Sequence, residues 1–275
     1  MTDDDAVARH YTKGDLAQRI MEAVHAVVPD MAHVTPRDLA PVDEFHIGGV
    51  KATETFTAKL GLRPGMSVLD VGSGIGGTAR FVADAHDCHV TGIDLTPEYC
   101  AVATMLSAAT GLSDVTEFHD GSALTMPFHD GHFGAAMTMH VAMNIEDKAG
   151  LYREVARVLK PGAVFGIYDV MVGSEGGDLD FPVPWSATPA TSYLATPDAM
   201  RGWLADAGFT IEQEDDRRDF AIDFFDGLKK NAADGPPPLG LHLLMGADFK
   251  QKVANMATNI AAGRCAPREM ICRKT

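Results

Sequence analysis

A run of glycines between residues 72 and 77 is the part of this sequence best suited to binding a ligand. Its residues are Gly72-Ser73-Gly74-Ile75-Gly76-Gly77, and glycine allows a tight turn and close approach of a ligand to the backbone. A helix after the turn would add free N–H groups and the positive end of its dipole. Gly72, Gly74 and Gly77 also satisfy the GxGxxG pattern of dinucleotide sites, so the sequence predicts a nucleotide-like ligand here.

Two aspartates near the turn indicate which ligand that is. Asp94 follows Gly72 by 22 residues, close to the spacing of about 20 at which an acid accepts hydrogen bonds from a ribose. Capping of a helix that starts at Pro97 is the structural alternative. Asp70 precedes Gly72 by two residues, where a carboxylate would repel a pyrophosphate and attract an ammonium group. S-adenosylmethionine combines adenine and ribose with a cationic amino acid, so Asp70 favours it over NAD.

A third polar segment, Asp120-Gly121-Ser122-Ala123, follows another apolar run. It offers a polar edge and an apolar wall for an adenine ring. The alternative interpretation of Asp120 is an ordinary acidic turn residue.

Several histidines and aromatic residues are candidates for contact with a substrate. His140 follows an apolar run, and its unperturbed pKa of about 6.5 suits a general base; lining the pocket or binding the cofactor is the alternative role. His46 and His242 are weaker candidates for the same chemistry. Trp185 and Tyr193 lie in a loop, where they either bound a substrate, with cation–π contact to a methylammonium group, or anchor the loop.

The elements that position these residues alternate between short apolar runs and helical segments. We expect strands at 66–71, 88–93, 115–119, 133–139, 163–170 and 209–213, with another at 270–273, and helices at 76–86, 97–110, 147–159 and 197–207. Such alternation, with runs too apolar to have a solvated face, predicts a parallel sheet covered by helices on both sides.

The segments outside this alternation are expected to cover the site. Residues 5–32 show helical periodicity, 33–44 are expected to be a loop, and a helix is expected at 49–61. Residues 172–195 are rich in Gly, Pro and Ser, and 222–263 suggest two helices around Asp234–Pro238. We therefore expect an N-terminal helical cap at 1–62 and a catalytic domain at 63–275, with lid insertions at 172–195 and 222–263.

Composition narrows the class of partner and the compartment. The 275 residues are 46% apolar and 22% charged, with a net charge of −15, which disfavours nucleic acids and anionic membranes as partners. No apolar run is long enough to span a membrane, and no secretion signal is recognisable. The four cysteines form no CxxC pair, and no residue spacing indicates a metal site. We expect a protein of the reducing cytoplasm.

Taken together, four segments resemble the successive motifs of class I S-adenosylmethionine-dependent methyltransferases. These are VLDVGSGIGG (68–77), GIDLTPEY (92–99), DGSALTMPFHDGHF (120–133) and VLKPGAVFGIYD (158–169). Residues 43–53 and 234–249 resemble, more loosely, the small-molecule enzymes of the sarcosine/dimethylglycine and ubiquinone-biosynthesis type. The resemblance implies an α/β, Rossmann-like, doubly wound sheet of seven strands, mostly parallel with an antiparallel last strand.

The resemblance also implies positions for the cofactor, S-adenosyl-L-methionine, and its product, S-adenosyl-L-homocysteine. The implied contacts are Asp70, Gly72 and Gly74 around the methionine part, Asp94 on the ribose, Leu95, Ser122 and Ala123 around the adenine with Asp120 nearby, Met139 and His140 facing the sulfonium, and His46 and Gly48 closing the site from the N-terminal side.

The function this implies is in-line transfer of a methyl group to a nitrogen, oxygen or carbon nucleophile of a small metabolite. A nicotinamide-dependent oxidoreductase and a non-catalytic S-adenosylmethionine-binding module are the alternatives. The sequence leaves open whether the protein is a homodimer.

Overall fold

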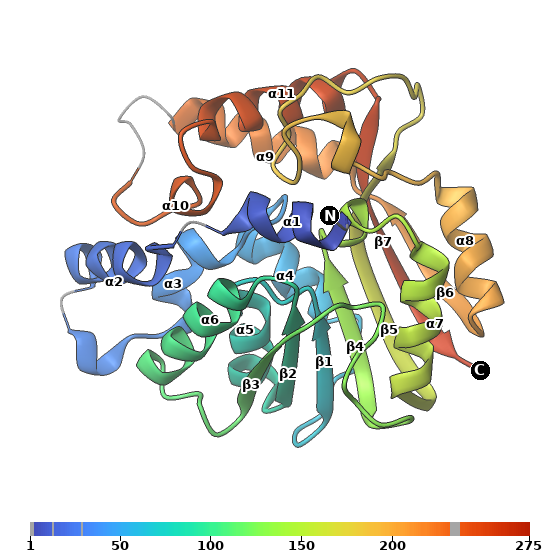
Figure 1. The fold of residues 1–275 in the computed structure, drawn as a ribbon, viewed down its shortest axis with the longest axis horizontal. Helices are drawn as coiled ribbons and strands as arrows, with labels where there is room; N and C mark the ends of the chain where they lie inside the picture. Colours follow the sequence, from blue (N-terminus) through green and yellow to red (C-terminus); the bar gives the residue numbers. More distant parts are fainter. Residues whose placement is uncertain (1–2, 13, 29, 232–236) are drawn as a thin grey trace.

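A mixed seven-stranded sheet forms the centre of the structure, a computed structural model that describes residues 3–12, 14–28, 30–231 and 237–275. Its strands are β1 (Ser67–Val71), β2 (His89–Asp94), β3 (Thr116–Asp120), β4 (Phe133–Met139), β5 (Leu159–Val172), β6 (Phe209–Asp216) and β7 (Cys265–Lys274). They lie in the order β3-β2-β1-β4-β5-β7-β6 (Figure 1). β1 to β5 are parallel, whereas β7 runs antiparallel to both β5 and β6. The expected α/β class and antiparallel last strand are confirmed.

Helices cover both faces of the sheet because its inner strands are apolar on both sides. The covering helices are α5 (Gly77–His86), α6 (Pro97–Ala109), α7 (Lys148–Val158) and α8 (Pro197–Asp206). Leu69 and Val71 of β1 pack with α7 and α8, while the preceding Val68 packs with α5 on the other face. Among the described helices, none is long and apolar enough to cross a membrane.

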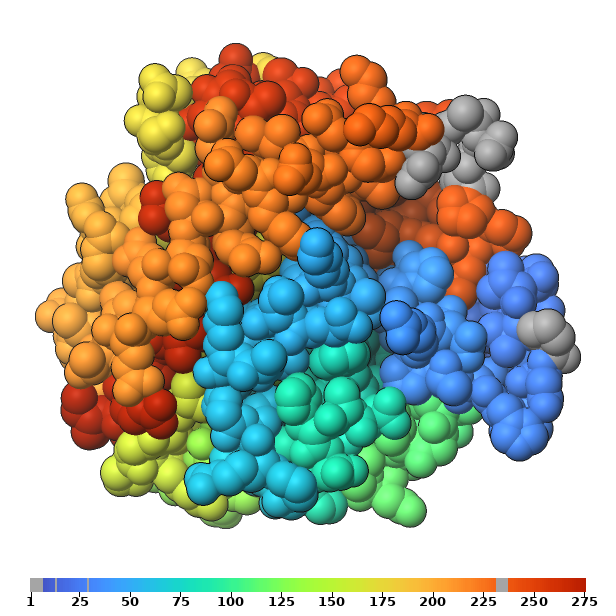
Figure 2. Space-filling model, turned by 180° about the vertical axis from the view of Figure 1, so that it is seen from behind, coloured from blue at the N-terminus to red at the C-terminus, as the bar shows by residue number. Residues whose placement is uncertain are grey.

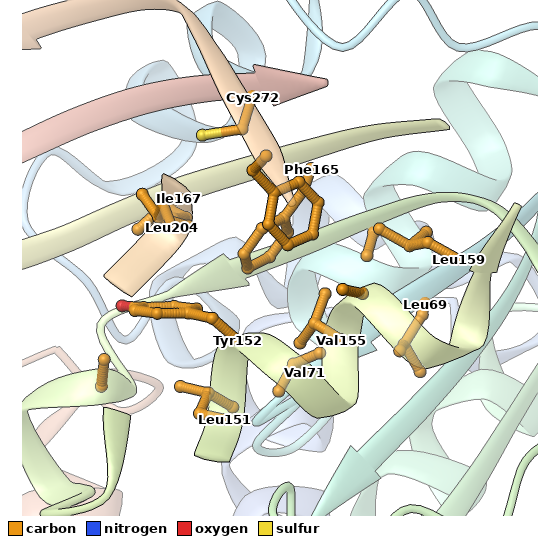
Figure 3. Packing of buried hydrophobic residues seen from close by; sticks show 14 of the residues in the cluster. Leu69, Val71, Leu151, Tyr152, Val155, Leu159, Phe165, Ile167, Leu204 and Cys272 are labelled. Atoms are coloured by element: carbon orange, nitrogen blue, oxygen red, sulfur yellow. The ribbon is translucent and has the colours of Figure 1, made fainter. Parts of the chain in front are cut away.

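The cluster beneath α7 shows how the sheet and helices are held together. Tyr152 and Val155 of α7 belong to the same buried cluster as Phe165 of β5 and Leu69 of β1 (Figure 3). All four side chains are fully buried, and burial of one such side chain stabilises the fold by about 1.5–3 kcal/mol. This packing fixes the strand ends at which the predicted site residues lie.

Four helices precede the sheet, and they differ from the sequence-based expectation. They are α1 (Asp3–Tyr11), α2 (Leu16–Val27), α3 (Pro36–Asp43) and α4 (Gly49–Thr57). The expected helical segment over 5–32 is divided near Gly14, whose φ of +86° separates α1 from α2. The expected loop at 33–44 contains α3, because Thr35 and Asp38 form a reciprocal capping box and Pro36 occupies the first turn.

A helical segment between β6 and β7 covers the carboxyl ends of the parallel strands, and we call it the lid. It contains α9 (Arg218–Asn231), α10 (His242–Met245) and α11 (Phe249–Ala261); Asp234–Pro236, part of the expected turn, lie outside the described residues. Leu243 and Leu244 pack with Leu16 and Ile20 of α2. Seen from behind, the orange lid therefore rests on the blue N-terminal helices (Figure 2).

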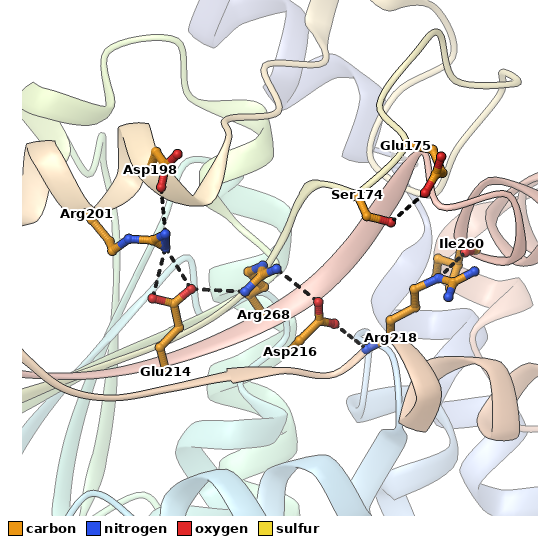
Figure 4. A network of polar contacts seen from close by, with 9 residues as sticks. All are labelled: Ser174, Glu175, Asp198, Arg201, Glu214, Asp216, Arg218, Ile260 and Arg268. Atoms are coloured by element: carbon orange, nitrogen blue, oxygen red, sulfur yellow. Dashed lines mark hydrogen bonds and ion pairs between the residues drawn. The ribbon is translucent and has the colours of Figure 1, made fainter.

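Ionic contacts hold the base of the lid at the antiparallel edge of the sheet. Arg268 of β7 contacts both Glu214 and Asp216 of β6 at 3.0 Å (Figure 4). Arg218, at the start of α9, donates to the carbonyl oxygens of Ile260 and Ala261, at the end of α11. The two ends of the lid are thus tied to each other and to the sheet.

Candidate active site

A cavity of about 370 Å³ lies between the sheet and the lid. It opens at the carboxyl ends of β1 and β4, where the strand order reverses, which is the usual ligand site of doubly wound sheets. Most of the residues predicted from the sequence line it: His46, Asp70, Gly72, Gly74, Asp94, Leu95, Ser122, Ala123, Met139, His140, Trp185 and His242.

Asp70, at the end of β1, carries the buried carboxyl group that most requires a positively charged partner. Its side chain is 2% exposed, and Oδ2 is buried with no hydrogen-bond partner among the described residues. Burial, and secondarily the charge of Asp94, raises the pKa of Asp70 to about 7. A cation in the cavity would compensate this charge, whereas a pyrophosphate would be repelled by it.

The glycine turn after β1 brings the backbone against the cavity. Gly72 has a φ of +73°, and a Cβ at this position would lie 2.3 Å from the side chain of Val141, so no other residue fits without displacement. Gly74 has open space where its Cβ would be. Its N–H donates to Asp94 Oδ2 at 2.8 Å, and the N–H of Thr96 donates to Asp94 Oδ1 at 2.9 Å. Asp94 is therefore held with its remaining lone pairs available to a ligand.

His140 has a different environment from the one expected of a general base. Its Nδ1 lies 3.1 Å from the carbonyl oxygen of Tyr168, and its Nε2 accepts from the N–H of Ile47 at 3.3 Å. A carbonyl can only accept, so Nδ1 carries the proton and the lone pair of Nε2 is engaged. Burial, with a smaller effect of His46, lowers the pKa of His140 to about 3. These contacts speak against His140 as the base and suit a ring that positions the loop.

His46 lies beside His140, with a ring-centroid distance of 6.1 Å, and is held by two buried groups. Its Nε2 is 3.1 Å from Glu44 Oε2 and 3.0 Å from Thr53 Oγ1, and Thr53 itself donates to Glu44 at 2.5 Å. This arrangement places the proton of the neutral ring on Nε2. Nδ1 has no hydrogen-bond partner in the described part of the chain and carries the lone pair.

Two buried residues, Asp169 and Lys148, hold the loop after β4 by hydrogen bonds to its backbone. Asp169 accepts from the N–H of Ala142 at 2.7 Å, and burial raises its pKa to about 7. Lys148 donates to the carbonyl oxygens of Ile145 and Tyr193, and burial lowers its pKa to about 8. This pair joins the loop after β4 to the loop after β5.

Three predicted site residues lie outside the cavity lining. A Cβ at Gly48 would lie 2.3 Å from the ring of Phe220 in α9, so this glycine packs under the lid. Tyr193 donates its hydroxyl to the carbonyl oxygen of Ala190 within its own loop. Asp120 is exposed and pairs in register with Asp94 at the end of β3.

Tyr11, Asn144 and Tyr99 are among the lining residues that were not predicted from the sequence. Tyr11 of α1 donates to Asn144 Oδ1 at 3.1 Å, and Asn144 Nδ2 donates to the carbonyl oxygen of Trp185. Tyr99 of α6 lines the cavity with a buried hydroxyl that has no partner among the described residues. The position of Asn144, four residues after His140, could have indicated that it lines the site. The sequence around Tyr11 and Tyr99 gave no such indication.

These features fit S-adenosylmethionine. The unpartnered carboxylate of Asp70 complements an ammonium group, and the fixed carboxylate of Asp94, 20 residues beyond Gly74, suits ribose hydroxyls. Leu95, Ser122 and Ala123 line the same cavity and offer apolar and polar groups for an adenine ring.

Comparison with known proteins agrees with this chemistry. Residues 69–167 match the family model described as a methyltransferase domain. Sterol 24-C-methyltransferase ERG6B of Gibberella zeae is 39% identical over 110 residues, which are 40% of this chain and 29% of that protein. The matched segments span about a third of the length of the first curated relatives.

Solved structures share the fold over more of the chain. A putative sarcosine dimethylglycine methyltransferase from Galdieria sulphuraria is 21% identical, with a TM-score of 0.66 over 82% of this chain and 85% of that one. Geranyl diphosphate C-methyltransferase from Streptomyces coelicolor A3(2) is 15% identical, with a TM-score of 0.72 over 100% of this chain and 99% of that one.

Residues 69–167 thus match a methyltransferase domain, and the cavity lies at the strand ends where the sheet order reverses. Outside the matched domain, the chain carries an N-terminal set of helices and a lid between β6 and β7.

Proposed function

We propose that this protein transfers the methyl group of S-adenosylmethionine to a nucleophilic nitrogen, oxygen or carbon atom of a small molecule. The observation that carries the proposal is the buried, unpartnered carboxylate of Asp70 beside the glycine turn. The cofactor supplies a methyl group on a positively charged sulfur, which is already a reactive donor. The protein's task is then to align the acceptor behind the methyl carbon, which can contribute roughly 7–11 kcal/mol to lowering the barrier.

The lining residues predicted from the sequence have the following roles in this proposal. Asp70 binds the ammonium group, Gly72 and Gly74 allow the methionine part to approach the backbone, and Asp94 accepts from the ribose hydroxyls. Leu95, Ser122 and Ala123 contact the adenine, and Met139 faces the sulfonium. The lid and α1 exclude water from the reacting atoms. His140 holds the loop after β4 through its two hydrogen bonds.

For an acceptor that loses a proton, His46 is the residue that receives it. Glu44 and Thr53 fix its Nε2–H, so the Nδ1 lone pair is the available one, and Glu44 stabilises the imidazolium that forms. A neutral amine needs no proton acceptor in the methyl-transfer step.

Two experiments test the proposal. Calorimetry with S-adenosylhomocysteine should show binding, and Asp94→Ala should weaken it; NAD binding without any S-adenosylhomocysteine binding would contradict the proposal. Incubation with methyl-labelled S-adenosylmethionine and a metabolite extract should give a labelled small product. Binding without a labelled product from any extract would favour a non-catalytic cofactor-binding module.

The predicted cytoplasmic location is part of the same proposal. All four cysteines, at 88, 100, 265 and 272, are buried free thiols, and such thiols persist in a reducing compartment.

A further inference from the structure

The cavity has a second half, beneath the lid, that the cofactor contacts proposed above do not use. Its lining is formed by Phe225 and Leu228 of α9, Leu244 of α10, and Phe249, Val253 and Met256 of α11. Leu228 is 41% exposed, one of two large apolar side chains left in solvent among the described residues. We call this region the acceptor chamber; it belongs to the same cavity as His46 and Met139.

The charge of the cavity is one-sided. In the described part of the chain, its lining contains no Lys or Arg. Its acids are Asp70, Asp94 and Asp43, of which Asp43 is paired with the buried Arg80 at 2.7 Å. A phosphate or carboxylate in such a place would lose its hydration without gaining a cationic side chain as its partner.

Several polar side chains in and around the cavity already form hydrogen bonds within the protein. Trp185 donates its indole N–H to Ser192 Oγ at 3.0 Å, and Asn144 is held between Tyr11 and the Trp185 carbonyl. Lys252 of α11 is buried outside the lining and donates to the carbonyl oxygen of Met245 at 3.0 Å. Burial, then the charge of Arg19, lowers the pKa of His242 below its usual value.

We propose that the methyl acceptor is an apolar molecule with a neutral nucleophile and no phosphate or carboxylate group. It lies under α9–α11, with its apolar body against the lid and its nucleophilic atom toward Met139 and His46. This inference rests on the proposed methyl transfer and names its substrate class. The nucleophile's electron pair forms the bond to the methyl carbon, the C–S pair stays on sulfur, and any proton released goes to His46 Nδ1.

Matched probes test the class directly by binding rather than turnover. The chain has two tryptophans; Trp203→Phe leaves Trp185, which lines the cavity, as the fluorescent reporter. With saturating S-adenosylhomocysteine present, we would titrate geraniol and farnesol against geranyl diphosphate and farnesyl diphosphate. The alcohols should bind at least about tenfold more tightly than their diphosphates, because a diphosphate would be desolvated there without a cationic partner.

A charge placed in the chamber should reverse that preference. Val253→Arg puts a guanidinium into the lining, whereas Ala254→Arg makes the same change on the exposed side of α11. We expect Val253→Arg to lower the alcohol-to-diphosphate affinity ratio by about tenfold or more, and Ala254→Arg to leave it within about twofold.

The outcomes separate the two proposals. Absence of S-adenosylhomocysteine binding would refute the proposed function. Two outcomes with normal S-adenosylhomocysteine binding would refute the acceptor class alone. In one, the diphosphates bind as tightly as the alcohols; in the other, neither alcohol binds. An equal effect of both arginine variants would show that the charge acts from outside the chamber and would also refute it.

Discussion

Replacing Asp70 with Asn should change both the strength and the pH dependence of cofactor binding. In the free protein, the pKa of Asp70 is about 7, so the carboxyl is about one-tenth ionised at pH 6 and about nine-tenths at pH 8. The ammonium group of S-adenosylhomocysteine binds the ionised form. Affinity should therefore rise about tenfold between pH 6 and pH 8, equivalent to about 1.4 kcal/mol.

The substitution removes the charge while keeping the shape of the side chain. At pH 8 the variant should lose the charge-assisted contact, at about 1.5–3 kcal/mol, and its affinity should vary little with pH. Asp206→Asn, at an exposed carboxyl at the end of α8, is the matched control and should behave like the unmodified protein.

Isothermal titration calorimetry in buffers of different ionisation enthalpy measures both quantities. At pH 6 the unmodified protein should release close to one proton on binding, and Asp70→Asn should release much less. Equal affinity of the two proteins at pH 8, or a flat pH profile in the unmodified protein, would refute the pairing of Asp70 with the ammonium group.

Further predictions concern stability and the other site residues. Because the folded pKa of Asp70 lies above its ordinary value of 3.8, the unliganded protein loses stability as the pH rises from about 4 through about 7; thermal melts should show Asp70→Asn more stable than the unmodified protein at pH 8 but not at pH 4. Asp94→Ala should weaken S-adenosylhomocysteine binding by about 1.5–3 kcal/mol, and unchanged affinity in calorimetry would mean that the ribose lies elsewhere. Gly72→Ala should cost about 1–3 kcal/mol, because its Cβ would strike Val141; denaturant titration checks this, and full stability would contradict the turn geometry. With a proton-releasing acceptor, His46→Gln should lower turnover, while His140→Ala should chiefly lower the melting temperature; the reverse pattern would restore His140 as the base.

The order of strands and the cofactor side of the cavity could be predicted from the sequence because their signals are local. Each apolar run ends in a residue of distinctive type, such as Asp70 or Asp94, and parallel strands bring such ends to one edge. The helix at Pro36–Asp43 was also encoded locally, in Thr35 and Asp38, but two prolines made the segment resemble a loop.

Other parts of the site depend on contacts between distant residues. His140 forms its hydrogen bonds with Ile47 and Tyr168. Its position after β4 alone therefore could not predict which ring nitrogen carries the proton. The same holds for Tyr11, which reaches Asn144 across 133 positions of sequence. Gly48 has the backbone of a ligand-binding glycine, yet the ring of Phe220 occupies the space beside it.

The place of the lid in the chain has a consequence for how such proteins diversify. The lid leaves the sheet at the end of β6 and returns at the start of β7, where Asp216 and Arg268 are paired in register. It is thus the loop of one long antiparallel hairpin, and the entropy of closing a loop grows only slowly with its length. The length of the segment between the two strands can therefore vary without altering strand register, which pairs such as Asp216 and Arg268 fix.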